Sequence, residues 1–184
     1  MEKWDAYDSN FRKIDGKILI RGEEKDIPDG VYHLVCEILV KHSDGSYLLM
    51  KRDDRKHYGG MWEATAGGSA LIGETPLQCA IRELKEETGI ETSALTKVGT
   101  EFNDKTHSVY VEFLCVTNWE KTNIQMQDGE TIDYKWVNRE DLIAMSKNEL
   151  VTERMQKYTR IREDHAGHLF PPLSGQGSAA GGST

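Results

Sequence analysis

The sequence contains only three cysteines and no apolar run that approaches the length of a membrane span. Its first residues, Met1 to Asp5, are too polar for a signal peptide. Cys36, Cys79 and Cys115 show no metal-binding spacing, and an odd, unpatterned count is typical of reduced thiols. We therefore expect a cytoplasmic protein without a membrane-spanning segment.

Basic residues are also in short supply. Lysine and arginine number 23 against 31 aspartates and glutamates, which gives a formal net charge of −8 and argues against a nucleic-acid partner. The exception is a local basic cluster made of Lys51, Arg52, Arg55 and Lys56. It is either a phosphate-facing patch or a solvated turn whose charge Asp53 and Asp54 balance. Arg52 ends a predicted strand and is the preferred candidate for binding substrate.

The length favours one domain, which we place at residues 1–166. The Gly-, Ser- and Ala-rich residues 167–184 are predicted to be a disordered tail, vector-derived in part. Strands are predicted at residues 17–21, 31–40, 46–51, 62–66, 95–102, 108–117 and 133–137, and helices at 76–88, 139–147 and 151–162. The order lacks a βαβ rhythm, so we expect an α/β or α+β sandwich, a mixed sheet with helices packed on it.

The helix at residues 76–88 has complete start and stop signals. Thr75 and Gln78 form a capping box, Pro76 occupies the first helical position, and Gly89 supplies the left-handed residue that ends the helix. The apolar spacing predicts a buried stripe of Leu77, Ala80, Ile81, Leu84 and Thr88.

The same helix carries Glu83, Glu86 and Glu87 within one turn. Like charges at this spacing repel, so the cluster calls for a positive partner. Glu83 and Glu87 fall beside the buried stripe and Glu86 lies farther round. A hard divalent cation suits this set, since Mg²⁺ takes carboxylates, waters and phosphate oxygens in octahedral geometry. The alternative is a solvated Glu/Lys helix face.

Residues 68–90 match a known motif at every fixed position. Gly68 is followed by Glu74, by Arg82-Glu83-Leu84, by Glu86-Glu87 and by Gly89-Ile90 at the spacing of the Nudix box. The chain therefore resembles the Nudix hydrolases, loosely over residues 30–145. The resemblance implies an α/β/α sandwich with a loop–helix–loop metal site, and hydrolysis of a diphosphate linkage.

The resemblance also implies roles for single residues. Glu83, Glu86 and Glu87 would bind Mg²⁺ (or Mn²⁺ in its place), with the Gly67 carbonyl completing the ligand set. Glu74 and Arg82 would be structural or orienting partners, and Arg82 could pair with Glu74 across the loop or with Glu86 on its own helix. The catalytic base would be Glu83 or Glu86, with Glu130 as the second choice and Glu112 behind it.

The sequence pattern is compatible with three functions. The preferred one is Mg²⁺-dependent hydrolysis of a nucleoside diphosphate linked to another group, a small-molecule substrate whose second moiety the motif does not specify. The layout also resembles type I isopentenyl-diphosphate isomerases, but Gly67 and Ser69 stand where those enzymes need a cysteine and a metal-binding histidine. The third is a non-catalytic nucleotide-sensing module, which would be expected to lose acids of the box.

The sequence leaves open the role of three aromatic residues and the oligomeric state. Phe102, Tyr110 and Trp136 could stack on a base, although we expect core packing for each. Many Nudix enzymes are dimers, so the resemblance leaves a homodimer open.

Overall fold

The computed structural model describes residues 1–154, 156 and 159. Nine strands and two α-helices follow one another within this part, with one short 3-10 turn at Glu24–Asp26. The elements are, in order, β1 (Lys3–Asp8), β2 (Lys13–Ile20), β3 (Val31–His42), β4 (Tyr47–Arg52), β5 (Trp62–Glu63), β6 (Ala66–Ser69), α1 (Pro76–Thr88), β7 (Leu95–Asn103), β8 (Ser108–Thr117), β9 (Thr131–Val137) and α2 (Arg139–Ala144).

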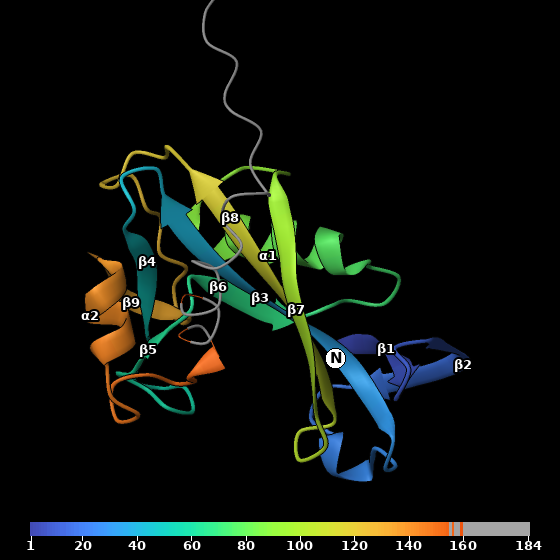
Figure 1. The fold of residues 1–184 in the computed structure, drawn as a ribbon. Helices are drawn as coiled ribbons and strands as arrows, with labels where there is room; N and C mark the ends of the chain where they lie inside the picture. The colour runs from blue at the N-terminus through green and yellow to red at the C-terminus, as the bar shows by residue number, and fades with distance from the viewer. Residues whose placement is uncertain (155, 157–158, 160–184) are drawn as a thin grey trace, which may run out of the picture.

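The 12-residue strand β3 organises a single mixed sheet (Figure 1). It pairs antiparallel with β1, β4 and β6, and parallel with β8 along ten positions, from His33↔Ser108 to His42↔Thr117. β7 extends the sheet beyond β8, and β9 and β5 flank β4. The β3–β4 hairpin turns at residues 43–46.

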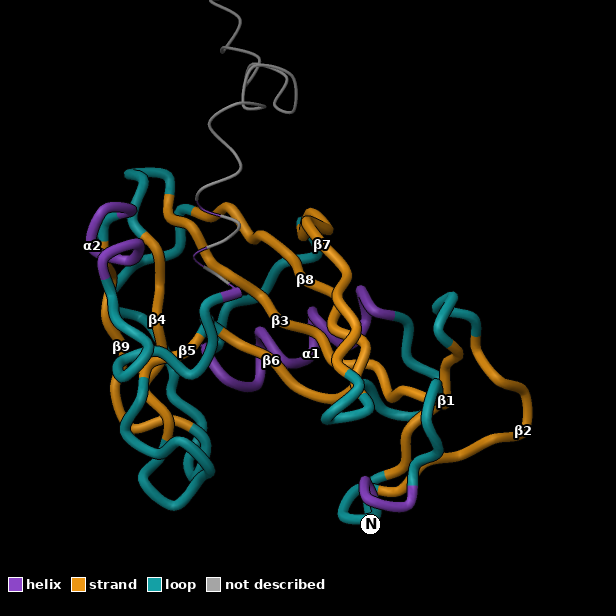
Figure 2. The backbone as a smooth tube through the Cα atoms, turned by 60° about the horizontal axis from the view of Figure 1, so that its bottom comes forward, coloured by secondary structure: helices purple, strands orange, loops and turns teal. Residues whose placement is uncertain are grey.

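The two faces of the sheet are covered by different helices. On one face α1 contributes Cys79, Ala80 and Leu84 to the main core. On the other face Leu142 of α2 packs in a smaller cluster with Leu39, Tyr47, Leu49 and Ala64. Figure 2 shows α2 at one end of the molecule and the β1–β2 hairpin at the other. The predicted sandwich of helices on a mixed sheet is therefore confirmed.

The sequence misses one strand and misplaces several ends. β1 lies in a segment for which no element was predicted, and its Trp4 and Ala6 are buried with Leu19 in a separate small core. The strand expected at 62–66 is two short strands, β5 and β6. The helix expected at 139–147 ends at Ala144. Most of the helix expected at 151–162, and the predicted tail, lie outside the described residues.

Helix α1 has the predicted bounds and caps. The Thr75 hydroxyl accepts from the Gln78 N–H, the Gln78 side chain accepts from the Thr75 N–H, and Gly89 is left-handed at φ 76°. The predicted stripe is partly wrong, because Leu77 is 41% exposed. The buried positions are instead Cys79, Ala80, Glu83, Leu84, Glu87 and Thr88, so two of the acids face inward with the apolar residues.

The three cysteines are free and buried, as predicted. Within residues 1–154, 156 and 159, no helix is long and apolar enough to cross a membrane.

Candidate active site

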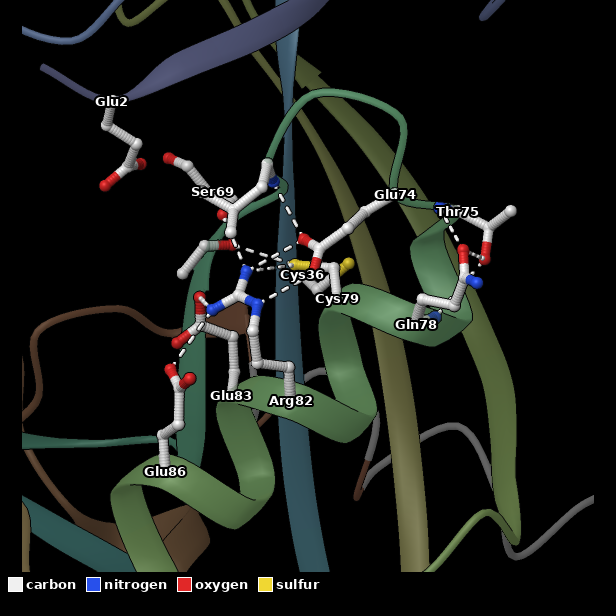
Figure 3. Close-up of polar contacts among 12 residues, drawn as sticks. Glu2, Cys36, Ser69, Glu74, Thr75, Gln78, Cys79, Arg82, Glu83 and Glu86 are labelled. Atoms are coloured by element: carbon white, nitrogen blue, oxygen red, sulfur yellow. Dashed lines mark hydrogen bonds and ion pairs between the residues drawn. The ribbon is translucent and has the colours of Figure 1, made fainter.

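Arg82 joins the loop before α1 to the acids on the helix (Figure 3). Its Nε and Nη2 donate to the two carboxylate oxygens of Glu74 at 2.7 and 2.9 Å, and Nη2 also donates to the Ser69 carbonyl oxygen at 3.2 Å. Its Nη1 donates to Glu83 at 2.7 Å and to Glu86 at 3.2 Å. Both pairings considered for Arg82 are therefore made at once, and they bring Glu74, Glu83 and Glu86 around one guanidinium.

Two acids of the helix lie directly on the two glycines of strand β6. Glu87 Oε2 accepts from the Gly67 N–H at 3.1 Å. The Glu83 carboxylate packs on Gly68 so closely that a Cβ there would lie 2.3 Å from its Oε1. At Gly67 a Cβ would lie 2.7 Å from the backbone oxygen of Cys36 in β3. At Gly67 backbone occupies the space of a side chain, so glycine is required there, whereas at Gly68 a side chain would have to displace the Glu83 carboxylate.

The acids are held close together, and two of them are buried. Burial raises the pKa of Glu87 to about 8, and the neighbouring charges of Glu63 and Glu83 add to the effect. Burial also raises the pKa of Glu83, against the opposing influence of Arg82. In contrast, the hydrogen bonds from Arg82 lower the pKa of Glu74. Buried like charges of this kind favour binding of either protons or a cation.

A second group of charges lies at the edge formed by β4 and β5. Arg52 Nη1 pairs with Glu63 Oε2, and Arg52 Nε donates to the His57 carbonyl oxygen at 3.0 Å. Lys56 Nζ pairs with Glu130 Oε2. Burial lowers the pKa of Lys56, and the charge of Arg52 acts in the same direction. Two cations therefore stand next to the acid cluster, each in contact with a carboxylate.

Glu112 lies on the face of the sheet opposite α1, as its strand alternation predicts. It is 1% exposed and faces Glu37 across the β3–β8 pair. Arg154 reaches this position from the C-terminal segment, where its Nε donates to Glu37 at 3.0 Å and lies 4.0 Å from Glu112 Oε1. The guanidinium also covers the Tyr110 ring at 3.8 Å. Glu112 is thus part of a buried charge cluster on the far face.

The carboxylate oxygens on the helix are suitable ligands for a hard divalent cation, but in this structure they do not point toward one common position. Glu83, Glu86, Glu87 and the Gly67 backbone together offer oxygen ligands of the kind that Mg²⁺ prefers. In residues 1–154, 156 and 159, no group of three His, Cys, Asp or Glu side chains is arranged to hold a metal ion. Arg82 occupies oxygens of Glu83 and Glu86 instead. The predicted ligand set stays a prediction.

Glu63 is the acid that sequence reasoning missed. It lies in β5, pairs with Arg52, and is close enough to Glu87 to raise that residue's pKa. Burial raises the pKa of Glu63 itself. The available signal was its place next to Trp62. Using it required the β4–β5 register, in which Glu63 faces Met50, two residues before Arg52.

The fold, the loop–helix unit and its acids define a hydrolase of diphosphate linkages. The chain belongs to the Nudix family, whose domain model matches residues 31–160. It is 33% identical over 147 residues to an uncharacterized Nudix hydrolase of Listeria innocua, covering 79% of this chain and 85% of that one. It is 32% identical over 130 residues to the nucleoside triphosphatase NudI of Escherichia coli, covering 62% of this chain and 87% of NudI.

A solved structure supports the fold over nearly the whole described chain. The Deinococcus radiodurans protein DR0079 superposes with a TM-score of 0.69 at 17% identity, covering 86% of this chain and 98% of its own. The family match and these curated relatives make the protein a Nudix pyrophosphohydrolase, and the isomerase layout is no more than a side resemblance.

Proposed function

We propose that this pyrophosphohydrolase uses Mg²⁺ to cleave the diphosphate linkage of a nucleoside diphosphate joined to another moiety. One observation carries the proposal: the Glu83 and Glu87 carboxylates are packed on two consecutive β6 glycines, Gly68 and Gly67, where buried negative charge accumulates. The name of the Escherichia coli relative, a nucleoside triphosphatase, supports a nucleotide as the substrate class.

The proposed ligands are Glu83, Glu86, Glu87 and the Gly67 carbonyl. A bound divalent cation would neutralise diphosphate charge and lower the pKa of a water. Arg82 keeps Glu74 against the loop and so holds Gly67 and Gly68 next to the helix. Its weaker contact, 3.2 Å to the exposed Glu86, is the one that ligand binding would most easily exchange.

Water attack at phosphorus needs a base, and exposure and pairing support one order of the candidates over the others. Glu86 is exposed to solvent, whereas Glu83 is 9% exposed and its raised pKa favours holding a proton. Glu130 is paired with Lys56 and would have to leave that partner to act. We therefore propose Glu86 first, Glu83 next and Glu130 last as the general base.

Arg52 is proposed to bind a substrate phosphate. Its side chain is 19% exposed and already held by Glu63 and the His57 carbonyl, which fixes its direction before substrate arrives. A guanidinium held in this way can still donate hydrogen bonds from its remaining N–H groups to phosphate oxygens. The free thiols support a reducing, cytoplasmic setting. A homodimer remains a prediction for sedimentation analysis.

The reaction class can be tested directly. A panel of nucleotide diphosphate substrates should be hydrolysed with Mg²⁺, and ¹⁸O from labelled water should appear in a phosphate product. Glu86→Gln should lower turnover strongly without unfolding the protein, while Glu91→Gln, on the exposed pair with Lys85, serves as a matched control. Label absent from phosphate, or a Glu86→Gln variant as active as Glu91→Gln, would refute the proposal.

A further inference from the structure

The loop between β4 and β5 presents an exposed aromatic ring on a backbone that disfavours it. Tyr58 has φ 59°, in the left-handed region, yet 53% of it is exposed. A bulky residue adopts this conformation at a conformational cost that glycine or asparagine largely avoids. Burial does not compensate for the cost here, and such strain points to a functional role for the side chain.

The backbone of the loop that carries Tyr58 is tied by several hydrogen bonds. Its ends are tied by the Arg52 N–H to the Met61 carbonyl at 3.0 Å and the Gly60 N–H to the Arg52 carbonyl at 3.1 Å. Asp53 accepts from the Arg55 N–H at 2.9 Å and from its side chain at 2.7 Å. Gly59 lies so close to Asp54 that a Cβ would be 2.6 Å from its backbone oxygen. The ring is presented by a preformed loop.

Tyr58 is linked to the acid cluster through the cations. Its ring lies beside the His57 imidazole, with centroids 4.0 Å apart. The His57 carbonyl accepts from Arg52, Arg52 pairs with Glu63, and the charge of Glu63 acts on Glu87. Along this series of contacts an aromatic ring comes first, a cation second and the acid cluster third. A nucleotide has its groups in the same order, with the base first, a phosphate second and the metal-bound phosphate third.

The aromatic residues named from the sequence are less suited to this role. The Tyr110 face is covered by Arg154 at 3.8 Å, and Lys121 lies 5.2 Å from the Trp136 ring. Phe102 packs edge-on against Tyr32 at 4.9 Å, close to the N-terminal hairpin, since Tyr32 pairs with Tyr7 of β1.

We propose that Tyr58, backed by His57, is the surface on which the aromatic base of the substrate stacks while its phosphates lie on Arg52 and Lys56. The inference rests on the proposed function and names the side chain that would recognise the aromatic base of the proposed nucleotide substrate. Stacking on a ring tolerates different bases, so the surface would select nucleotides as a class.

The test compares ADP with inorganic pyrophosphate, which has no base, by calorimetric titration of the full chain with Mg²⁺ present. Tyr58→Ala should weaken ADP binding about fivefold or more and leave pyrophosphate binding unchanged. Tyr58→Phe keeps the ring and should bind both as the wild type does. Tyr58→Gly should lose ADP affinity like Tyr58→Ala but melt at a higher temperature, because glycine relieves the backbone strain. Phe102→Ala is the control and should change neither affinity.

The outcomes separate this inference from the proposed function. Equal ADP affinity in the wild type and Tyr58→Ala would overturn the stacking surface, as would an equal loss of ADP and pyrophosphate binding or a loss confined to Phe102→Ala. If the enzyme hydrolyses nucleotides normally in that case, only the inference fails. Hydrolysis of base-free diphosphates alone would remove the proposed nucleotide substrate and the inference together.

Discussion

Replacing Arg82 by alanine tests whether the loop and the helix form one unit. The side chain is 23% exposed, and it holds Glu74 and Glu83, which are 19% and 11% exposed. Breaking a buried pair costs about 3–5 kcal/mol, whereas an exposed pair contributes at most about 1 kcal/mol. For this partly buried network we expect a loss of about 2–3 kcal/mol, because Glu83 and Glu74 would remain partly buried without the cation that pairs with both.

The loss should appear in both stability and catalysis. At 2–4 °C per kcal/mol, the melting temperature should fall by about 5–10 °C. kcat/KM should fall about a hundredfold, since displacing reacting groups by about 1 Å has an effect of that size. Arg82→Lys keeps the positive charge but loses the planar guanidinium that binds two partners at once. It should therefore recover only part of the loss in melting temperature and in kcat/KM.

The matched control is Arg21→Ala, because Arg21 pairs with Glu2 at 2.9 Å but is 65% exposed. That change should lower the melting temperature by no more than about 4 °C and leave kcat/KM unchanged. If Arg82→Ala and Arg21→Ala melt together and turn over substrate equally well, the coupling of loop and helix through Arg82 is wrong.

Three further predictions concern single side chains. Glu87→Gln should weaken Mn²⁺ binding at least about tenfold in a calorimetric titration yet raise the melting temperature of the metal-free protein, because like-charge repulsion is relieved; unchanged Mn²⁺ affinity would remove Glu87 from the ligand set. Gly68→Ala should lower kcat without unfolding the chain, as its methyl group would displace the Glu83 carboxylate, and normal kcat would contradict the close packing seen there. Burial lowers the pKa of His33 from 6.5 to about 4, so the unfolded chain takes up its proton first as pH falls. The free energy of unfolding should therefore be steady above pH 6.5 and fall by up to about 3 kcal/mol between pH 6.5 and 4, and urea titrations of His33→Phe, whose ring can still stack on Trp4, should show a smaller slope if this is right.

The parts of the fold that the sequence predicts are those with local causes. Helix α1 is set by Thr75, Pro76 and Gly89, all within one stretch of chain, and its bounds are correct. The sequence does not predict β1 because its burial depends on distant partners. Trp4 and Ala6 become buried only when β1 pairs with β3, and when β2 pairs with β1 and brings Leu19 into the same cluster.

The candidate site also has a part that the local sequence predicts and a part that depends on distant partners. The acids at 83, 86 and 87 could be named because helical spacing brings them together, whereas the buried side of the helix was misjudged at Leu77 and Cys79. That side is fixed by the β6 glycines, since Glu83 lies on Gly68 and the Cys79 thiol lies 3.6 Å from the Gly68 carbonyl. Glu63 and Tyr58 depend on how β4, β5 and their loop close, which no local pattern specifies.

The parallel pairing of β3 with β8 bears on how the chain reaches its native state. His33 and Ser108, which pair at the start of this ladder, are 75 residues apart in the sequence. Closing so long a segment has an entropic cost that must be met before the ladder gains any hydrogen bonds, and folds dominated by such contacts form slowly. The β6 loop, α1 and their acids all lie inside the closed segment. We therefore expect the proposed metal site to form late in folding, so that added Mg²⁺ slows unfolding far more than it speeds refolding.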